Sequence, residues 1–429
     1  MSTTKNVLVV GARGFIAGYI IAALEQAGFN VLRGVRKANG ELRENERYCD
    51  YSAMNTAQEW LPSLKDVDVV VNAAGILRET ATQKFKAIHI VGPLTLADAC
   101  TQAGVNQFIQ ISVLGSAEDG EFLATKHEFD QRLLALPLKS VVLRPSLVYS
   151  SSGSYGGTSL LRAIAGFPLV ALQPSDGHWP MQPIACEDVA QLVVHAIINQ
   201  TQGLFEAGGP EVMSLHEYQM QWRRWLNIAG KKVIPFPQWF IAAQVKVSDV
   251  IGSGPIGQTM WRMLQRGNVA QPQAYEKLAK DIGYSPKSLK QNLSARPSQV
   301  QDRWHAQLYF LAPTLRVMLI LVWLISGYLG LFTDAGQIQA MAMNSFLENW
   351  QPALMARIFG VFDLLLAIWL ATPWRTRWAI GLMGASVIGY SIVLGITAPL
   401  LWLDPLAGLA KNLVLIPAIA ALWIMTDRR

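Results

Sequence analysis

The segment "NVLVVGARGFIAGYIIAAL", residues 6–24, decides how the first half of this chain folds. Its opening apolar run is typical of a buried strand, and the apolar spacing that follows is typical of a helix. Gly11, Gly14 and Ala17 mark the junction with the spacing G-x-x-G-x-x-A. A strand, a glycine turn and a helix in this order predict a dinucleotide-binding unit, because the glycines let the backbone approach a pyrophosphate at the helix N-terminus. The alternative is a plain strand-to-helix turn.

Cations at the end of the second predicted strand bear on which dinucleotide binds. A site for NAD usually places an acid about 20 residues after the glycines, where it binds the ribose 2'-hydroxyl. The segment "NVLRGVRK", residues 30–37, ends in Arg36 and Lys37 instead, and Arg13 lies inside the glycine loop. We therefore predict NADP as the cofactor, with NAD as the weaker ligand. The alternative is that these cations are merely solvated.

Strands and helices alternate through the residues that follow. Strands are predicted at 66–71, where Asn72–Gly75 follow, at 107–116 and at 139–150, and helices at 86–104 and 127–136. Such alternation predicts an α/β fold with a doubly wound parallel Rossmann sheet. Ligands of this architecture bind beyond the carboxyl ends of the strands. The segments at those ends are Asn72–Gly75, Ser112 and Arg144–Tyr149.

The chain becomes strongly apolar from Thr314 onward. The segment "WAIGLMGASVIGYSIVLGITAPLLWL" carries no charge and is longer than the about 20 residues that cross a bilayer. We predict a bundle of four transmembrane helices, at Thr314–Phe332, Leu354–Ala371, Trp378–Leu403 and Leu406–Met425.

Basic residues set the predicted orientation of these spans. Arg375 and Arg377 lie in the second connection and the chain ends "TDRR", whereas the first connection holds Asp334 and Glu348. Because cytoplasmic loops collect Lys and Arg, four spans with both chain ends in the cytoplasm fit this pattern. No apolar stretch of signal-peptide length precedes the first strand, so we expect the N-terminal domain to be cytoplasmic.

Two charges inside the predicted spans call for partners. Asp363 and Lys411 lie at matching predicted depths, and a charge in hydrocarbon is costly, so we expect them to pair inside the bundle with Asn412 alongside. The alternatives are that Lys411 reaches the surface, or that Asp363 pairs with Arg357. Small residues on the third span are expected to let the helices approach closely. They are Gly381, Ala385 and Gly389.

Charge and cysteine content exclude other classes of function. The net charge is +6, but the basic residues form no cluster interleaved with aromatics, so we predict no nucleic-acid partner. Anionic lipid and a phosphate-bearing cofactor account for the charge. Cys49, Cys100 and Cys186 lack the spacing of a zinc site or a disulfide framework, so we predict core positions for them and no metal.

Seven segments, taken in order, resemble the short-chain dehydrogenase/reductase superfamily, and in particular its atypical branch related to the 39 kDa subunit of respiratory complex I. They read "GARGFIAG", "VNAAGIL", "IHIVGP", "ISVLGS", "LRPSLVYS", "MQPIACEDVA" and "FEAGGPEVMSLHEY". The tail segments "WLISGYLGLF" and "WLDPLAGLAKNL" resemble the DoxX-like family of small four-helix membrane proteins. A fusion of the two is a bacterial arrangement, which implies a multi-pass protein of the bacterial inner membrane.

The resemblance implies a catalytic site in which one group is missing. The superfamily uses a tyrosine hydroxyl to pass a proton, and a lysine four residues later lowers the pKa of that tyrosine and holds the ribose. Ser112 matches the serine that orients the substrate carbonyl and Lys126 matches the lysine, but Phe122 stands where the tyrosine belongs. Phenylalanine has no proton to give, so the usual acid is absent from its usual place.

The predicted cofactor-binding residues are Gly11, Arg13, Gly14, Phe15, Ile16, Arg36, Asp50, Ala73, Ala74, Gly75 and Lys126. Tyr149 and Tyr155 are alternative proton donors near the expected pocket. His89 is expected to pack within its helix, and His178 is expected to be a solvated loop residue.

We predict three domains: a Rossmann domain at 1–205, a small substrate lobe with its linker at 206–305, and a DoxX-like domain at 306–429. The apolar lobe suits a lipophilic substrate, the bilayer surface or simply its own core. Two functions remain open. The first is hydride transfer with a lipophilic carbonyl or quinone-like substrate, carried out by Ser112 and Lys126. The second is a non-catalytic module that senses NADPH or stabilises a membrane complex, which the phenylalanine favours.

Overall fold

The computed structural model describes residues 5–36, 41–230, 232–251, 257–343, 346–403 and 407–426. The chain divides into two compact units, a first unit of Met1–Ala306 and a second unit of Gln307–Arg429. The predicted boundary between a Rossmann domain and a substrate lobe at residue 205 falls inside the first unit and stays a prediction.

A seven-stranded parallel sheet forms the centre of the first unit, with the order β11-β6-β5-β4-β1-β2-β3. The order reverses at β1, from which the chain winds outward in both directions. This confirms the predicted doubly wound Rossmann sheet. The strands are β1 Asn6–Val10, β2 Asn30–Val35, β3 Glu46–Tyr48, β4 Val69–Asn72, β5 Gln107–Ile111, β6 Ser140–Pro145 and β11 Gly203–Ala207.

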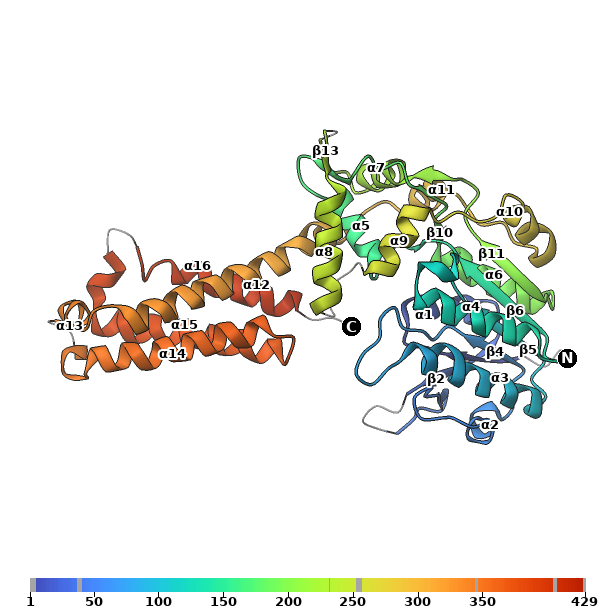
Figure 1. The fold of residues 1–429 in the computed structure, drawn as a ribbon, viewed down its shortest axis with the longest axis horizontal. Helices are drawn as coiled ribbons and strands as arrows, with labels where there is room; N and C mark the ends of the chain where they lie inside the picture. Colours follow the sequence, from blue (N-terminus) through green and yellow to red (C-terminus); the bar gives the residue numbers. More distant parts are fainter. Residues whose placement is uncertain are drawn as a thin grey trace. The chain divides into compact units, whose positions relative to one another are not determined.

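Helices cover both faces of this sheet (Figure 1). One face packs on α1, Phe15–Gln26, and α6, Cys186–Ile198. The other packs on α3, Gly92–Ala103, and α4, Glu121–Leu134, with the short α2, Ala57–Trp60. Because both faces are covered, strands such as β1 are apolar along most of their length instead of alternating.

A smaller lobe with its own core completes the first unit. Its apolar cluster centres on Tyr149 and Trp222, and its helices include α5 Gly157–Ala165, α7 Leu215–Trp225 and α11 Leu289–Ala295. A two-stranded parallel pair, β8 Ala171–Pro174 and β13 Val233–Phe236, lies in the same lobe. Because α5 and β8 precede residue 206, this lobe is not confined to the predicted range 206–305, and the bounds of a substrate lobe stay a prediction.

The second unit is a bundle of apolar helices (Figure 1). Three helices are long and apolar enough to cross a membrane: α12 Val300–Phe332, α14 Pro352–Ala371 and α15 Thr376–Thr397. The fourth, α16 Asn412–Met425, is apolar but shorter. Two predicted bounds are wrong. The third segment does not continue as an α-helix to Leu403, because α15 ends before a 3-10 turn at Pro399–Leu403. The fourth helix begins at Asn412, whereas its predicted first residue, Leu406, lies outside the described residues.

Three glycines let α12 and α14 touch backbone to backbone. A Cβ added at Gly330 would lie 2.7 Å from the Ala356 carbonyl oxygen, and one at Gly360 would lie 3.0 Å from the Gly327 carbonyl oxygen. Only glycine allows so close a crossing, which is how membrane helices gain packing without a hydrophobic driving force. The small row predicted on α15 contributes less, because Gly381 faces Trp423 while Gly389 has no atom within 4 Å.

We predict that Gly330→Ala and Gly360→Ala each lower the melting temperature of the detergent-solubilised protein. The added methyl group meets backbone that cannot give way, and such overpacking costs about 1–3 kcal/mol. Gly389→Ala is the matched control, because it adds the same methyl group where nothing is near. It should leave the melting temperature unchanged or raise it, since alanine is the better helix former. Equal effects at all three positions would contradict the close crossing.

Candidate functional site

The glycine loop after β1 packs directly on the loop after β4. Gly11 has a φ of +80°, and a Cβ added there would lie 2.8 Å from the Ala74 Cα. The Ala73 amide donates to the Val10 carbonyl at 3.1 Å, and the Gly14 amide donates to the Gly11 carbonyl at 2.8 Å. Both the left-handed backbone and the missing side chain are therefore needed at Gly11.

The N-terminus of α1 fits the pyrophosphate of a dinucleotide. The helix begins at Phe15 after Gly14, no side chain caps it, and its first turn holds no acid. Its first amides are thus left for an outside acceptor, and the helix dipole favours a negative charge there. Phe15 and Ile16, both predicted cofactor contacts, occupy this first turn and are half-buried.

Asn72, at the end of β4, shapes the loop that carries Ala73, Ala74 and Gly75. Its amide nitrogen donates to the Gln110 side-chain oxygen at 2.8 Å, and its own oxygen accepts from the Ala74 amide at 3.1 Å. The side chain is buried, so this polar pair between β4 and β5 is satisfied internally. The result is a fixed loop in which Gly75 remains exposed.

Two predicted cations lie around the ends of β1 and β2. The Ala12 amide donates to the Gly34 carbonyl at 3.2 Å, which ties the glycine loop to the strand that Arg36 follows. Arg36 is exposed, and the Arg13 side chain is 63% exposed with its guanidinium 3.7 Å from the Glu46 carboxylate. Lys37 lies outside the described residues. Glu46 on β3 is an acid that the sequence pattern did not reveal, because β3 is too short to be recognised.

Asp50, another predicted cofactor residue, lies just after β3. Its carboxylate accepts from the Ser52 amide at 2.8 Å, and its carbonyl accepts from Ala53 and Met54. One carboxylate oxygen therefore stabilises a turn of the protein itself.

Lys126 lies beneath the β4 loop. Its amine donates to the Ile111 carbonyl at 3.0 Å, and it lies 3.3 Å from where a Cβ of Gly75 would be. Burial lowers the pKa of Lys126 to about 8, while the negative charge of Asp130 on the same helix acts in the opposite direction. The structure thus brings a buried ammonium group to the exposed glycine of the predicted cofactor site.

His89 lies beside the same glycine, and hydrogen bonds within the protein occupy both of its ring nitrogens. Its Nε2 accepts from the Ile76 amide at 3.1 Å, and its Nδ1 lies 3.0 Å from the Thr125 hydroxyl. That hydroxyl donates to the Glu121 carbonyl at 2.8 Å, so the histidine Nδ1–H must be the donor of the pair. Burial, together with the charge of Lys126, lowers the pKa of His89 to about 3. The imidazole is therefore neutral and fixed in one tautomer.

Phe122 closes an aromatic cluster with Phe85 and His89. The Phe122 ring lies 5.6 Å from the His89 ring and 6.1 Å from the Phe85 ring, centroid to centroid. It is buried on the face of α4 that also carries Lys126, four residues later. Packing therefore accounts for the phenylalanine, and the ring adds no acid to the site.

Ser112 is turned toward an ion pair. Its hydroxyl donates to one carboxylate oxygen of Asp130 at 2.7 Å. That carboxylate oxygen also accepts from the Arg144 guanidinium at 2.8 Å. Asp130 is completely buried and its second carboxylate oxygen has no hydrogen-bond partner in the described residues. To orient a substrate carbonyl, Ser112 would first have to release this carboxylate.

The two tyrosines predicted as alternative proton donors differ in their exposure to solvent. Tyr149 is buried in the core of the small lobe, where burial raises the pKa of its hydroxyl. Tyr155 is 62% exposed and its ring stacks on Phe15 at 6.1 Å. His178 is exposed beside Asp176, as expected of a loop residue.

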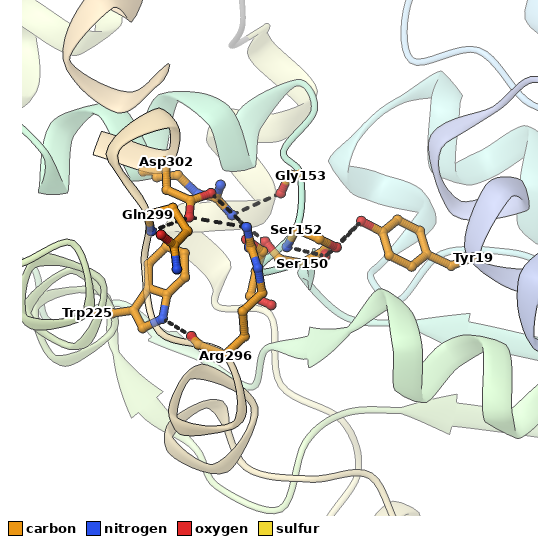
Figure 2. A network of polar contacts seen from close by, with 10 residues as sticks. Tyr19, Ser150, Ser152, Gly153, Trp225, Arg296, Gln299 and Asp302 are labelled. Carbon is orange, nitrogen blue, oxygen red and sulfur yellow. Dashed lines mark hydrogen bonds and ion pairs between the residues drawn. The ribbon is translucent and has the colours of Figure 1, made fainter. Parts of the chain in front are cut away.

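A polar network that the sequence did not indicate holds the loop at Ser150–Gly153 against α1 (Figure 2). From one side, the Tyr19 hydroxyl contacts Ser150 at 2.8 Å and Ser152 at 2.9 Å. From the other side, Arg162 donates to the carbonyls of Ser150 and Gly153, and Arg296 donates to the Ser151 carbonyl. Arg296 also forms an ion pair with Asp302, near the start of α12. Isolated arginines far apart in sequence carry no pattern, so only the structure brings them together.

Two family models match parts of this chain. Residues 7–202 match the NAD dependent epimerase/dehydratase family, and residues 320–423 match the DoxX-like family. The chain therefore joins a segment similar to the NAD dependent epimerase/dehydratase family to a segment similar to the DoxX-like family. The second match, together with the three long apolar helices, supports a membrane-integral unit.

Two curated relatives are named as mitochondrial subunits of an NADH dehydrogenase and of an NADH-ubiquinone oxidoreductase. The mouse NADH dehydrogenase [ubiquinone] 1 alpha subcomplex subunit 9 is 25% identical over 199 residues, which is 44% of this chain and 52% of that protein. The Neurospora crassa NADH-ubiquinone oxidoreductase 40 kDa subunit is 27% identical over 151 residues, 33% of this chain and 40% of its own. The chain thus spans about half or less of these relatives.

Solved structures share the fold of the first unit. The human epimerase family protein SDR39U1, solved with NADPH, has a TM-score of 0.51 at 21% identity and covers 68% of this chain and 98% of its own. A Bacillus cereus UDP-glucuronic acid 4-epimerase, solved with UDP-glucuronic acid and NAD, has a TM-score of 0.50 at 19% identity. The match covers 71% of this chain and 100% of the epimerase chain. These likenesses support the Rossmann architecture.

We predict that NADPH affinity falls between about pH 7 and about pH 9, because the Lys126 ammonium, with its pKa of about 8, loses its charge over this range. Charge-assisted hydrogen bonds contribute about 1.5–3 kcal/mol, so the loss is expected to be about tenfold or more. His89 and His127 are already neutral, since burial lowers the pKa of each. In Lys126→Met, affinity should be low and independent of pH. Calorimetric titration of both proteins tests this, and an equal pH dependence in the variant would contradict a role for Lys126.

Proposed function

We propose that this protein is a membrane-anchored, NADP(H)-binding oxidoreductase that exchanges hydride with a lipophilic carbonyl or quinone-like substrate. The observation that carries the proposal is the cradle formed by Gly11, Gly75 and the uncapped start of α1, with the Lys126 ammonium beside it. Bound NADP(H) would supply or accept the hydride. The chain itself would hold the pyrophosphate at Gly14–Ile16 and place a positive charge next to the reacting end of the site.

The preference for NADP rests on the cations at the ends of β1 and β2. Arg13 and Arg36 are both exposed at this edge, and the first residue after β2 is a cation where an NAD site has its acid. Glu46 approaches Arg13 only to 3.7 Å, and the Arg13 side chain is 63% exposed, so Arg13 remains available to a phosphate.

In this proposal Lys126, and not a tyrosine, donates or accepts the proton of the reaction. His89 uses both ring nitrogens, Phe122 has no hydroxyl, and the Ser112 hydroxyl donates to Asp130. The Lys126 ammonium has further N–H groups beyond the one on Ile111, and a pKa of about 8 suits proton transfer near neutral pH. A lipophilic substrate fits a domain that is tethered to apolar helices.

A second candidate function is a non-catalytic module that senses NADPH or stabilises a membrane assembly. The hydrogen bond from Ser112 to Asp130 favours this non-catalytic function, because the serine hydroxyl already donates to a group of the protein itself. The matched relatives are named as subunits of larger NADH-oxidising enzymes, which also favours a structural role. For either function we propose four spans in a bacterial inner membrane with the first unit in the cytoplasm.

Arg13 and Arg36 are expected to set the preference for NADPH over NADH. Arg13→Ala and Arg36→Ala should each weaken NADPH binding while leaving NADH binding nearly unchanged, because each removes a charge-assisted bond to the 2'-phosphate worth about 1.5–3 kcal/mol. Arg33→Ala is the matched control, since Arg33 lies on the same strand but pairs with Glu25 at 2.6 Å. Calorimetric titration with both nucleotides decides the matter. Equal affinities for NADPH and NADH in the unaltered protein would remove the basis for the preference.

Restoring the tyrosine separates the two candidate functions. Phe122→Tyr should raise NADPH-dependent carbonyl reduction, because a positioned general acid contributes about 10² to 10⁴ in rate. Phe85→Tyr adds a hydroxyl to the same aromatic cluster on a different element, and it should bring no such gain. The assay is NADPH consumption by membranes supplied with a quinone or a polyprenyl carbonyl. No gain in Phe122→Tyr, with NADPH binding intact, would favour the non-catalytic module.

A further inference from the structure

The second unit holds a buried carboxyl group, that of Asp363, which forms no ion pair with any residue that the structure describes. Asp363 is 4% exposed and lies on α14, about 16 Å along the helix axis from Pro352 and about 12 Å from Ala371. It is therefore near the middle of a helix long enough to cross a membrane. An ionised carboxylate at such a depth costs about 2.5–3.5 kcal/mol even on lenient insertion scales.

Two hydroxyl groups from neighbouring helices surround this carboxyl. The Ser326 hydroxyl, on α12, lies 2.6 Å from one oxygen, and the Tyr390 hydroxyl, on α15, lies 3.5 Å from the other. The glycine crossing of α12 and α14 places the backbone of Gly327, next to Ser326, against Gly360, one turn before Asp363. Three helices thus meet at Asp363, and the group is inside the bundle and not on its surface.

The predicted ion pair between Asp363 and Lys411 is wrong. Among the described residues no ion pair includes Asp363, and Lys411 is exposed at the start of α16. Asn412 donates to Ser391 at 3.0 Å, not to Asp363. The alternative pairing with Arg357 is also wrong, because that guanidinium donates to the carbonyls of Gly330 and Thr333.

The remaining cations of the packed helices also have other contacts. Arg316 on α12 donates to the Leu370 and Thr372 carbonyls, and Arg377 on α15 lies over the Trp423 ring. The groups that face Asp363 are therefore the hydroxyls of Ser326 and Tyr390. Both are neutral hydrogen-bonding groups, which tolerate a carboxyl group in either charge state but do not balance a negative charge.

We propose that Asp363, with Ser326 and Tyr390, is a proton-binding site inside the DoxX-like domain. The carboxyl group carries a proton in the assembled bundle, and this proton supplies the charge balance that no side chain provides. Intramembrane carboxyl groups of this kind mark proton relays and ligand sites in membrane proteins. The site is independent of the nucleotide site and stands whether or not the first unit is catalytic.

Carbodiimide labelling of the full-length protein in lipid nanodiscs tests the proposal. A protonated carboxyl adds across one C=N bond of dicyclohexylcarbodiimide: its oxygen bonds to carbon, its proton moves to nitrogen, and an acyl shift leaves a stable N-acylurea. We expect this adduct on the Asp363 peptide by mass spectrometry at about pH 7, where an aqueous aspartate, with a pKa of about 3.9, is ionised. Glu211, which is exposed in the first unit, is the internal control and should react only with a water-soluble carbodiimide.

Three variants sharpen the result. Asp363→Asn should abolish the adduct and keep the melting temperature, because the amide replaces a neutral acid of the same shape. Ser326→Ala and Tyr390→Phe each remove a donor that favours the ionised form, so labelling should persist to higher pH. The proposal is overturned if Asp363 stays unlabelled from about pH 5 to about pH 8, where an aqueous aspartate is ionised. It is equally overturned if Asp363→Asn lowers the melting temperature markedly, since that is the behaviour of an ionised partner in a buried pair.

Discussion

The first unit depends on the close approach of the loops that follow β1 and β4. With no side chain at Gly11, the backbone of Ala74 can lie against it, and hydrogen bonds from Ala12 to Gly34 and from Ala73 to Val10 link three neighbouring strands at the same edge. This contact leaves the first turn of α1 facing outward with its amides unused. It also fixes Gly75 above Lys126, so one packing constraint sets both ends of the proposed nucleotide site.

The chemistry of this site is governed by where protons are held. His89 is locked as a neutral imidazole between a backbone amide and a threonine hydroxyl, and Ser112 donates to the buried Asp130. Such satisfied networks are rigid, because breaking one bond leaves a buried polar group unpaired. Lys126 is the group that combines burial, a charge and N–H groups beyond its one backbone contact. Such a site leaves little freedom for acid–base exchange outside Lys126, which is compatible with both proposed functions.

Each unit buries an aspartate side chain, and the groups that surround the two carboxyls differ. In the first unit Asp130 is buried against Arg144, which compensates it directly. In the second unit Asp363 is buried among hydroxyl groups, while the nearby arginines satisfy carbonyl groups at helix ends. The difference follows from geometry, because long cationic side chains reach the ends of membrane helices more cheaply than their middle.

By itself, the sequence determined the order of strands and helices, the glycine fingerprint and the apolar tail, because each is a local pattern of spacing and hydropathy. It also pointed to Lys126 and Phe122 through their spacing on one helix, although their roles remain predictions. Only the tertiary structure decided which side chains meet. The turn of Ser112 toward Asp130, the arginine network around Ser150, and the hydroxyl partners of Asp363 join residues far apart in sequence. The same reason explains the wrong pairing of Asp363 with Lys411: matching depth in a membrane places two residues at one level, whereas helix rotation and packing decide whether they face each other.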